Sequence, residues 1–217
     1  VYFYEMGNRL SIDLLDKYAA DFGFGKKTGI DLHGEANGLI ASPSYKQKVF
    51  KEDWFLGDTF NAAIGQGFTL ATPIQIAQML SAVATDGKRF KPHLVSKIIN
   101  DDGSIVKNFQ PSLEGSLPVS QENLDLVQGA LKAVTKEGGT ASSLESLPVS
   151  VAGKTGTAEN PHGRDHGWFI AYAPAEKPKY VVVCIVEQGS YGAVSAAPIV
   201  KTILEYLFAD ENKKVGK

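Results

Sequence analysis

The chain has 217 residues, of which 43% are hydrophobic, enough for one substantial core or for a large part of a bigger domain. Its 22 Lys and Arg residues against 24 Asp and Glu residues give a formal net charge of -2, which argues against nucleic acid or an acidic lipid surface as a partner. The single cysteine, Cys184, excludes an internal disulfide and is expected to be a buried thiol, because it lies in an apolar run.

A membrane-spanning helix needs roughly 18 to 20 apolar residues, and we find no such run in the sequence. Residues 1–7 have neither the basic segment nor the cleavage site of a signal peptide. We therefore expect any signal or membrane anchor to lie outside this sequence.

Residues 1–22 place apolar side chains at near-helical spacing, and Gly23 and Gly25 follow as a helix stop. Because this pattern is already under way at Val1, we expect a further segment upstream. Residues 25–67 are rich in Gly, Asp and Asn with aromatic residues between them, which predicts long irregular loops. Loops of this length often carry function.

Residues 72–86 form the clearest predicted helix, with a proline at its first position and Asp-Gly as its stop. A strand over residues 93–99, followed by the turn residues 101–104, predicts a hairpin. Ser120 is a typical N-cap for another helix, which two glycines at 138 and 139 end.

The last third alternates strand and turn signals, with strands predicted over residues 149–159, 168–172 and 180–187 and a closing helix from 196 or 197 to about 208. Short connections between consecutive strands favour antiparallel pairing. The predicted fold class is therefore α+β, an antiparallel sheet flanked by helices.

The most informative stretch is residues 151–159, Val-Ala-Gly-Lys-Thr-Gly-Thr-Ala-Glu, where small residues surround one cation and two hydroxyls. In a strand, Thr155 and Thr157 project to one side, while Gly156 leaves the backbone open to a peptide-like ligand. Lys154 adds a positive charge beside them. Hydroxyls and an ammonium bind a carboxylate and a backbone N–H stabilises an oxyanion, a combination typical of acyl transfer on a substrate that ends in a carboxylate.

Other interpretations compete with this one. Lys154–Gly156 taken alone also fits an ordinary glycine-rich strand with a solvated lysine. A phosphate-binding loop is rejected because it needs a glycine five positions before Gly153, where Pro148 stands. His162 and His166 have the spacing of metal ligands on a helix, but the neighbouring proline and glycine favour a polar turn.

Several separated motifs occur in an order that resembles class B penicillin-binding proteins, especially the elongation-type penicillin-binding protein 2, along nearly the whole chain. These motifs are Gly57-Asp58-Thr59, Ile64-Gly65-Gln66-Gly67 with Ala71-Thr72-Pro73-Ile74-Gln75, the Gly153 to Ala158 stretch, His166-Gly167-Trp168-Phe169 with Tyr172-Ala173-Pro174, and Glu187-Gln188-Gly189 leading to Ala196-Ala197-Pro198-Ile199. The resemblance implies the penicillin-binding transpeptidase or serine β-lactamase-like fold, here incomplete.

The resemblance also implies roles for the Lys-Thr-Gly strand. Lys154 and Thr157 are implied to be catalytic, with Lys154 contributing positive charge and helping proton transfer and the Thr157 backbone N–H forming half of the oxyanion hole. The hydroxyls of Thr155 and Thr157, next to Gly156, are implied to bind the substrate carboxylate. No cofactor and no metal are implied.

The implied reaction is that of a peptidoglycan D,D-transpeptidase, in which a serine attacks the D-alanyl-D-alanine end of a stem peptide and an amine of a second stem peptide resolves the acyl-enzyme. The implied ligands are this stem peptide and β-lactam antibiotics, which acylate the same serine, and the implied protein partner is a membrane glycan polymerase of the elongation machinery. The implied location is the outer face of the cytoplasmic membrane, or periplasm, with an N-terminal anchor outside this sequence.

The chain departs from the family pattern in one respect: the Ser-x-x-Lys and Ser-x-Asn motifs that precede the segment resembling residues 1–4 are not in their place. The one Ser-x-x-Lys, at Ser104 and Lys107, follows a predicted turn, whereas a catalytic serine should open a helix that sets its lysine one turn later beside it. We therefore expect residues 1–217 to be the C-terminal part of a single transpeptidase domain, without the nucleophile and inactive alone.

Two alternative functions stay open at this point. One is a serine β-lactamase or D,D-carboxypeptidase of the same fold, which a deacylation rate distinguishes from a transpeptidase. The other is a non-catalytic penicillin-binding sensor or scaffold, which the presence or absence of the upstream serine distinguishes. The motifs between residues 57 and 73 and the C-terminal Ala-Ala-Pro favour the transpeptidase.

Overall fold

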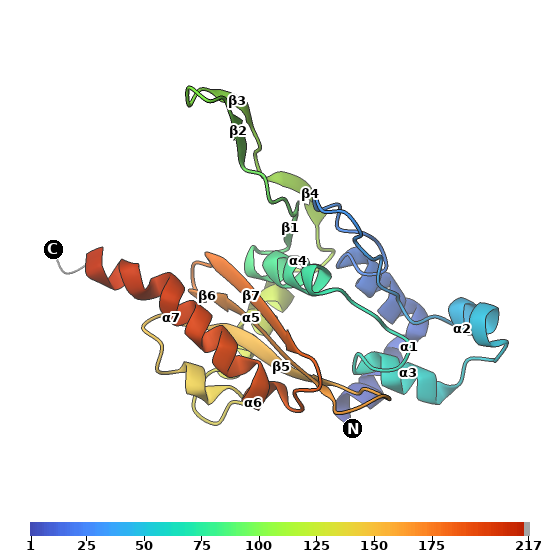
Figure 1. Ribbon diagram of the computed structural model, residues 1–217. Helices are drawn as coiled ribbons and strands as arrows, with labels where there is room; N and C mark the ends of the chain where they lie inside the picture. Colours follow the sequence, from blue (N-terminus) through green and yellow to red (C-terminus); the bar gives the residue numbers. More distant parts are fainter. Residues whose placement is uncertain (215–217) are drawn as a thin grey trace. The chain divides into compact units, whose positions relative to one another are not determined.

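The computed structural model describes residues 1–214, with side chains up to residue 209, and divides the chain into two compact units. One unit comprises Val1–Gln78 and Lys88–Leu117, and the other comprises Met79–Gly87 and the chain from Pro118 onward. The elements follow in the order α1 Tyr2–Asp21, α2 Pro43–Phe50, α3 Leu56–Ala63, α4 Pro73–Ala84, β1 Lys88–Lys91, β2 Lys97–Ile99, β3 Ile105–Asn108, β4 Ser112–Ser116, α5 Gln121–Ala133, the 3-10 turn η1 Ser142–Leu144, β5 Ala152–Ala158, β6 His166–Ala173, β7 Tyr180–Val186, α6 Gly192–Ser195 and α7 Ala197–Lys214 (Figure 1).

In the first unit, α1 is two helical segments joined by a kink at Ser11, whose φ of 67° and ψ of 161° are not helical. This backbone region is one that residues other than glycine rarely adopt. Helix α3 packs against α1 at Gly7, where an added Cβ would lie 2.4 Å from the Cβ of Ala63. The sequence predicted this helix but not its kink.

Gln75 fixes the start of α4 to two loops of the first unit. Its backbone N–H donates to the Thr72 hydroxyl at 3.3 Å, and its side-chain oxygen accepts from the Thr72 N–H at 2.9 Å, which is a reciprocal capping box. Its side-chain NH2 donates to the carbonyls of Lys26 at 2.7 Å and Asn37 at 2.8 Å. A buried glutamine thus satisfies the helix end and holds the loops that precede it.

The first unit also carries two antiparallel strand pairs, β1 with β4 and β2 with β3. The β2–β3 hairpin turns at residues 101–104 and extends away from β1 and β4 (Figure 1). All seven residues of β2 and β3 are exposed. The predicted hairpin is therefore confirmed, although its first strand begins at Lys97 and not at residue 93.

The second unit is built on a three-stranded antiparallel sheet in the order β5-β6-β7. Helix α7 crosses one face of this sheet and α5 lies against the other (Figure 1). On the α7 side, Phe169 and Ala171 of β6 pack in one cluster with Val200 and Leu204 of α7. On the opposite side, Tyr172 of β6 packs with the end of α4 and with α5, at residues Leu80, Ala84 and Leu131.

The predicted α+β class with an antiparallel sheet flanked by helices is confirmed, and so are the three C-terminal strands, the helix capped by Ser120 and the closing helix. The helix after Ser120 ends at Ala133, however, and not at the predicted glycines 138 and 139. The sequence analysis did not predict α2, α3, β1, β4 or α6, and it took residues 25–67 for irregular loops. Cys184 is partly buried against the α7-side cluster, and burial raises the pKa of its thiol.

One helical stretch, Gly192–Ala209, is long and apolar enough to cross a membrane by length and composition, with a mean hydropathy of 1.3. The sequence analysis found no run of about 18 to 20 apolar residues and so did not identify this stretch as a candidate. Its buried residues Ala197, Val200, Leu204 and Phe208 belong to the core of the second unit. Core packing accounts for the buried third of this stretch, while Val194, Ile199 and Tyr206 of the same stretch are exposed.

Candidate active site

The Lys-Thr-Gly stretch forms β5, at the edge of the three-stranded sheet. Among residues 1–214, β5 pairs with β6 on one side only, in the register Thr155 with Phe169 and Thr157 with Gly167. Alternate backbone groups of an edge strand point away from the sheet, where an extended peptide can pair as an added strand. The strand therefore offers the kind of surface that peptide-binding sites use.

The register places the candidate side chains on both faces of β5. Thr155 and Thr157 share a face, as predicted, while Lys154 and Gly156 pair with Ile170 and Trp168 on the other. Lys154 nevertheless returns to the strand, because its Nζ donates to the carbonyl oxygen of Thr155 at 2.8 Å. The ammonium and the Thr155 hydroxyl are thus attached to the same short piece of backbone.

Thr155 also contacts the loop that follows α5. Its hydroxyl lies 2.9 Å from the hydroxyl of Thr140, within hydrogen-bond distance, and either oxygen can be the donor. An open pocket of about 460 Å³ lies beside this contact. It is lined by Ala130, Ala133, Val134, Glu137, Gly138, Gly139, Thr140 and Lys154. The sequence analysis did not single out Thr140, which lies fifteen residues before Thr155 along the chain.

Gly156 has a packing reason to be glycine in addition to the open backbone that we predicted. A Cβ at Gly156 would lie 3.2 Å from the Cβ of Trp168. At the start of α6, a Cβ at Gly192 would lie 2.0 Å from the Trp168 carbonyl oxygen and 2.4 Å from that of Gly156. The backbone of α6 therefore lies directly against the backbone of β5 and β6.

Ser104 and His162 take the structural roles that the sequence analysis favoured, whereas His166 lies in a strand and not in the predicted polar turn. Ser104 lies in the β2–β3 turn, where its N–H bonds to Asp102 and its hydroxyl accepts from Asn100 at 2.9 Å, and Lys107 is on strand β3, not on a helix. His166 begins β6, and its Nδ1 lies 3.0 Å from the N–H of Gln188, while His162 lies in the turn before β6. No group of three metal-binding side chains occurs in the described part of the chain.

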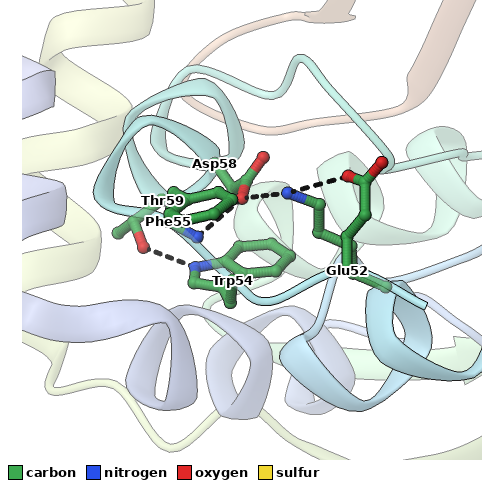
Figure 2. A network of polar contacts seen from close by, with 6 residues as sticks. Glu52, Trp54, Phe55, Asp58 and Thr59 are labelled. Carbon is green, nitrogen blue, oxygen red and sulfur yellow. Dashed lines mark hydrogen bonds and ion pairs between the residues drawn. The ribbon is translucent and has the colours of Figure 1, made fainter. Parts of the chain in front are cut away.

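The Gly57-Asp58-Thr59 motif belongs to a polar network in the first unit (Figure 2). Asp58 accepts from the Lys46 ammonium at 2.8 Å and from the Phe55 N–H at 2.8 Å, and Glu52 lies 3.6 Å from the same ammonium. Burial opposes ionisation of Asp58, but the hydrogen bonds from Lys46 and the Phe55 N–H together with the charge of Lys46 outweigh it, and the pKa of this carboxyl is lowered. Asp58 therefore joins the first turn of α3 to α2, and no sequence signal indicated that Lys46 would be buried.

Gly65 and Gly67 of the neighbouring Gly-Gln-Gly motif have φ values of 78° and 77°, a region that favours glycine. This supports the loop-shaping interpretation of the motif.

Comparison with known proteins decides the family. The family model described as "Penicillin binding protein transpeptidase domain" matches residues 1–205. The chain belongs to the penicillin-binding protein transpeptidase family. Its β5 contains Lys154, Thr155 and Gly156, a Lys-Thr-Gly sequence of the kind that occurs in penicillin-binding proteins.

The peptidoglycan D,D-transpeptidase MrdA of Salmonella typhimurium is a similar protein, 34% identical over 95% of this chain and 36% of that protein. Among solved structures, Pseudomonas aeruginosa PBP2 in complex with WCK 5153 is 37% identical, with a TM-score of 0.84, over 97% of this chain and 45% of that chain. A structure described as showing coordination of polymerization and crosslinking by a peptidoglycan synthase complex is 33% identical, with a TM-score of 0.79, over 94% of this chain and 35% of that chain. The chain thus has the penicillin-binding fold and spans about a third of the length of the curated relative.

Proposed function

We propose that this chain is the C-terminal part of the catalytic domain of a peptidoglycan D,D-transpeptidase, which joins stem peptides through a serine acyl-enzyme and is acylated by β-lactams. The observation that carries the proposal is β5 itself: an edge strand with two hydroxyls on one face and an ammonium bonded back to its backbone. Its similarity to MrdA supports the same activity.

In this proposal the donor stem peptide lies along β5 with its terminal carboxylate at the hydroxyls of Thr155 and Thr157. Hydroxyl groups and a nearby ammonium compensate the charge of a carboxylate that leaves water. Lys154 supplies the positive charge and assists proton transfer, and the Thr157 N–H donates to the oxyanion. Gly156 keeps side-chain atoms away from the ligand.

The reaction has two steps. The serine oxygen, from a segment upstream of this chain, bonds to the carbonyl carbon of the penultimate D-alanine; the amide C–N bond breaks, and the terminal D-alanine leaves with the serine proton on its nitrogen. An amine of a second stem peptide then attacks the ester, forms the new amide and returns a proton to the serine oxygen. A β-lactam enters the first step by opening its own ring.

Further proposals concern the whole protein. We propose that residues 1–217 belong to one transpeptidase domain completed by the serine-bearing segment and inactive without it. A membrane glycan polymerase is the proposed partner, which the similarity to a peptidoglycan synthase complex supports. The proposed location is the outer face of the cytoplasmic membrane, with an anchor upstream.

Intact-mass spectrometry after incubation with a penicillin tests the function, on this chain and on the protein extended by its natural upstream sequence. We expect one added penicillin mass on the extended protein only. If this chain without the extension also gained the mass, one of its own serines would be reactive. No mass gain on either protein would favour a sensor or scaffold. Rapid hydrolysis of the adduct would favour a β-lactamase.

The anion-binding role of β5 has its own test in the extended protein. Thr155→Val and Thr157→Val keep the side-chain shape but each remove one hydrogen bond to a charged group, a loss of about 1.5–3 kcal/mol in the acylation transition state. We expect the second-order rate constant of penicillin acylation to fall correspondingly in each variant. Wild-type rates in both variants would refute the carboxylate-binding assignment.

A further inference from the structure

We propose that Thr140 is a positioning residue of the active site, whose hydroxyl aims the hydroxyl of Thr155 at the carboxylate of the substrate. The inference rests on the proposed function, because it assigns a second residue to the same anion-binding step. The observation that carries it is the 2.9 Å distance between the two hydroxyl oxygens.

The loop from residue 134 to 141 holds Thr140 in a defined place. Gly139 lies so close to the end of α5 that a Cβ on it would be 2.3 Å from the carbonyl oxygen of Val134. On the other side of Thr140, Ala141 is 3% exposed, and its N–H donates to the Val134 carbonyl at 2.9 Å. Both neighbours of Thr140 are therefore fixed by packing or by hydrogen bonds.

The same loop is also bonded to the residue that immediately precedes β5. The buried hydroxyl of Thr135 donates to the carbonyl oxygen of Val151 at 2.6 Å. The hydroxyls of Thr135 and Thr140 thus contact Val151, the residue before β5, and Thr155 within its motif. The Thr135 contact fixes the loop beside the strand, and the Thr140 contact reaches a side chain with a proposed role in binding.

The number of hydrogens on the two hydroxyls explains how Thr140 can direct the hydroxyl of Thr155 toward a ligand. A threonine hydroxyl has one hydrogen and two acceptor lone pairs. When Thr140 donates to Thr155, the single hydrogen of Thr155 points elsewhere and is available to a ligand. A carboxylate accepts hydrogen bonds and cannot donate them, so its arrival selects this direction along the pair. Two aligned hydrogen bonds also polarise and strengthen each other.

The Lys154 ammonium adds to the same arrangement, because it donates to the Thr155 carbonyl at 2.8 Å. Thr155 is thus held at its hydroxyl by Thr140 and contacted at its carbonyl by Lys154. A ligand anion at this residue meets a hydroxyl of fixed direction and a nearby positive charge.

The test compares Thr140→Val, which keeps the shape and removes the hydroxyl, with Thr140→Ser, which keeps the hydroxyl. Both are made in the protein extended by its upstream segment and assayed for acylation by a penicillin and by its methyl ester, which lacks the carboxylate. We expect Thr140→Val to slow acylation by the free acid roughly three- to ten-fold, the effect of one neutral hydrogen bond, and to leave acylation by the ester unchanged.

Three further variants complete the design. Thr140→Ser is expected to acylate at the wild-type rate. The double variant Thr140→Val/Thr155→Val is expected to be no slower than Thr155→Val alone, because the two residues act through one bond. Ser143→Ala removes an exposed hydroxyl from the adjoining turn η1 and serves as the control, with no expected effect.

The outcomes separate the positioning role from the proposed function. An equal loss with acid and ester would show a displaced strand, and additive losses in the double variant would show independent action; either result overturns the positioning role. Wild-type rates for Thr140→Val beside a slowed Thr155→Val would also refute it while the proposed function stands. If the wild-type protein is not acylated at all, the proposed function fails and the role of Thr140 fails with it.

Discussion

At the scale of single residues, Asp16 on α1 carries a charge that the fold disfavours. Partial burial and repulsion from Asp13 raise the pKa of Asp16 from 3.8 to about 6. Between these two pH values the folded protein retains a proton that the unfolded chain has released, so stability falls as the pH rises through this range. Above pH 6 the folded state contains an ionised carboxylate in an unfavourable place.

We therefore expect Asp16→Asn to stabilise the protein above pH 6 and to remove the decline in stability between pH 4 and 6. Urea unfolding at several pH values measures this effect. Asp13→Asn provides the matched variant, because it removes the repulsive neighbour and should lower the pKa of Asp16. Identical pH profiles for wild type and Asp16→Asn would contradict the assignment.

Gln75 is a second residue with a measurable role, because its buried amide serves three backbone groups. Gln75→Leu leaves the carbonyls of Lys26 and Asn37 without their donor and the Thr72 N–H without its acceptor. Buried polar groups without partners cost about 1–3 kcal/mol each, so we expect a loss of at least about 2 kcal/mol in the free energy of unfolding. Gln47→Leu on the exposed face of α2 is the control. An equal loss of unfolding free energy in this variant would refute the role of Gln75 in holding the two loops to α4.

At the scale of elements, two glycines of the second unit allow a matched comparison. Gly129 lies inside α5 with open space around it, so Gly129→Ala should stabilise the domain by about 0.5–1 kcal/mol through helix propensity. Gly192→Ala places a methyl group against the carbonyls of Trp168 and Gly156, so one of the backbones must move. We expect Gly192→Ala to lower the melting temperature and, by displacing β5, to slow acylation, while Gly129→Ala leaves acylation unchanged.

The elements also show what the sequence pattern contains. The helix at residues 73–84 and the three C-terminal strands could be predicted from apolar periodicity, because an element that is buried on one face has apolar residues at regular spacing. Helix α2 was missed because its buried residue is Lys46, at 4% exposure, while its apolar Val49 and Phe50 are exposed. Strand β1 was missed because Lys-Arg-Phe-Lys has no alternation.

The candidate site also contains residues that the sequence predicts and one residue, Thr140, that it does not. Residues 154–157 could be identified from the sequence because one strand carries them together. Thr140 could not, since its proximity to Thr155 depends on how the loop after α5 folds back on the sheet. The kink at Ser11 also had no local signal, because serine is not the residue that such a backbone conformation predicts.

At the scale of the whole molecule, ionised carboxylates hold the loops of the first unit. Asp31 accepts from the N–H groups of Leu94 and Val95, and these bonds lower its pKa. The pKa of Glu35 is also lowered, because hydrogen bonds from Thr28 and Gly29 outweigh the opposing effect of burial. The pKa of Asp58 is lowered in the same way, with Lys46 as the main hydrogen-bond donor. The stability that these groups contribute is present above their unfolded pKa values, near 4, and is lost as the pH falls through the lower folded values.

We therefore expect acid to loosen the first unit progressively below pH 4. The two tryptophans report separately, since Trp54 lies in the first unit and Trp168 in the second. The indole N–H signal of Trp54, which donates to Thr59 at 2.9 Å, should lose its folded position on acidification. The combined variant Asp31→Asn/Glu35→Gln should weaken this pH dependence, and an unchanged Trp54 signal down to pH 2 would contradict the expectation.

The β2–β3 hairpin has a practical consequence for work on this protein. Its strands bury none of their residues, and its tip at Asp101–Ser104 forms hydrogen bonds within the tip and to the adjoining Asn100. Exposed tips of this kind tolerate inserted sequence because no core contact is lost. A short peptide tag or a fluorophore-bearing cysteine placed between Asp102 and Gly103 would therefore give a reporter that removes no core contact of the first unit, in a chain whose single cysteine is partly buried.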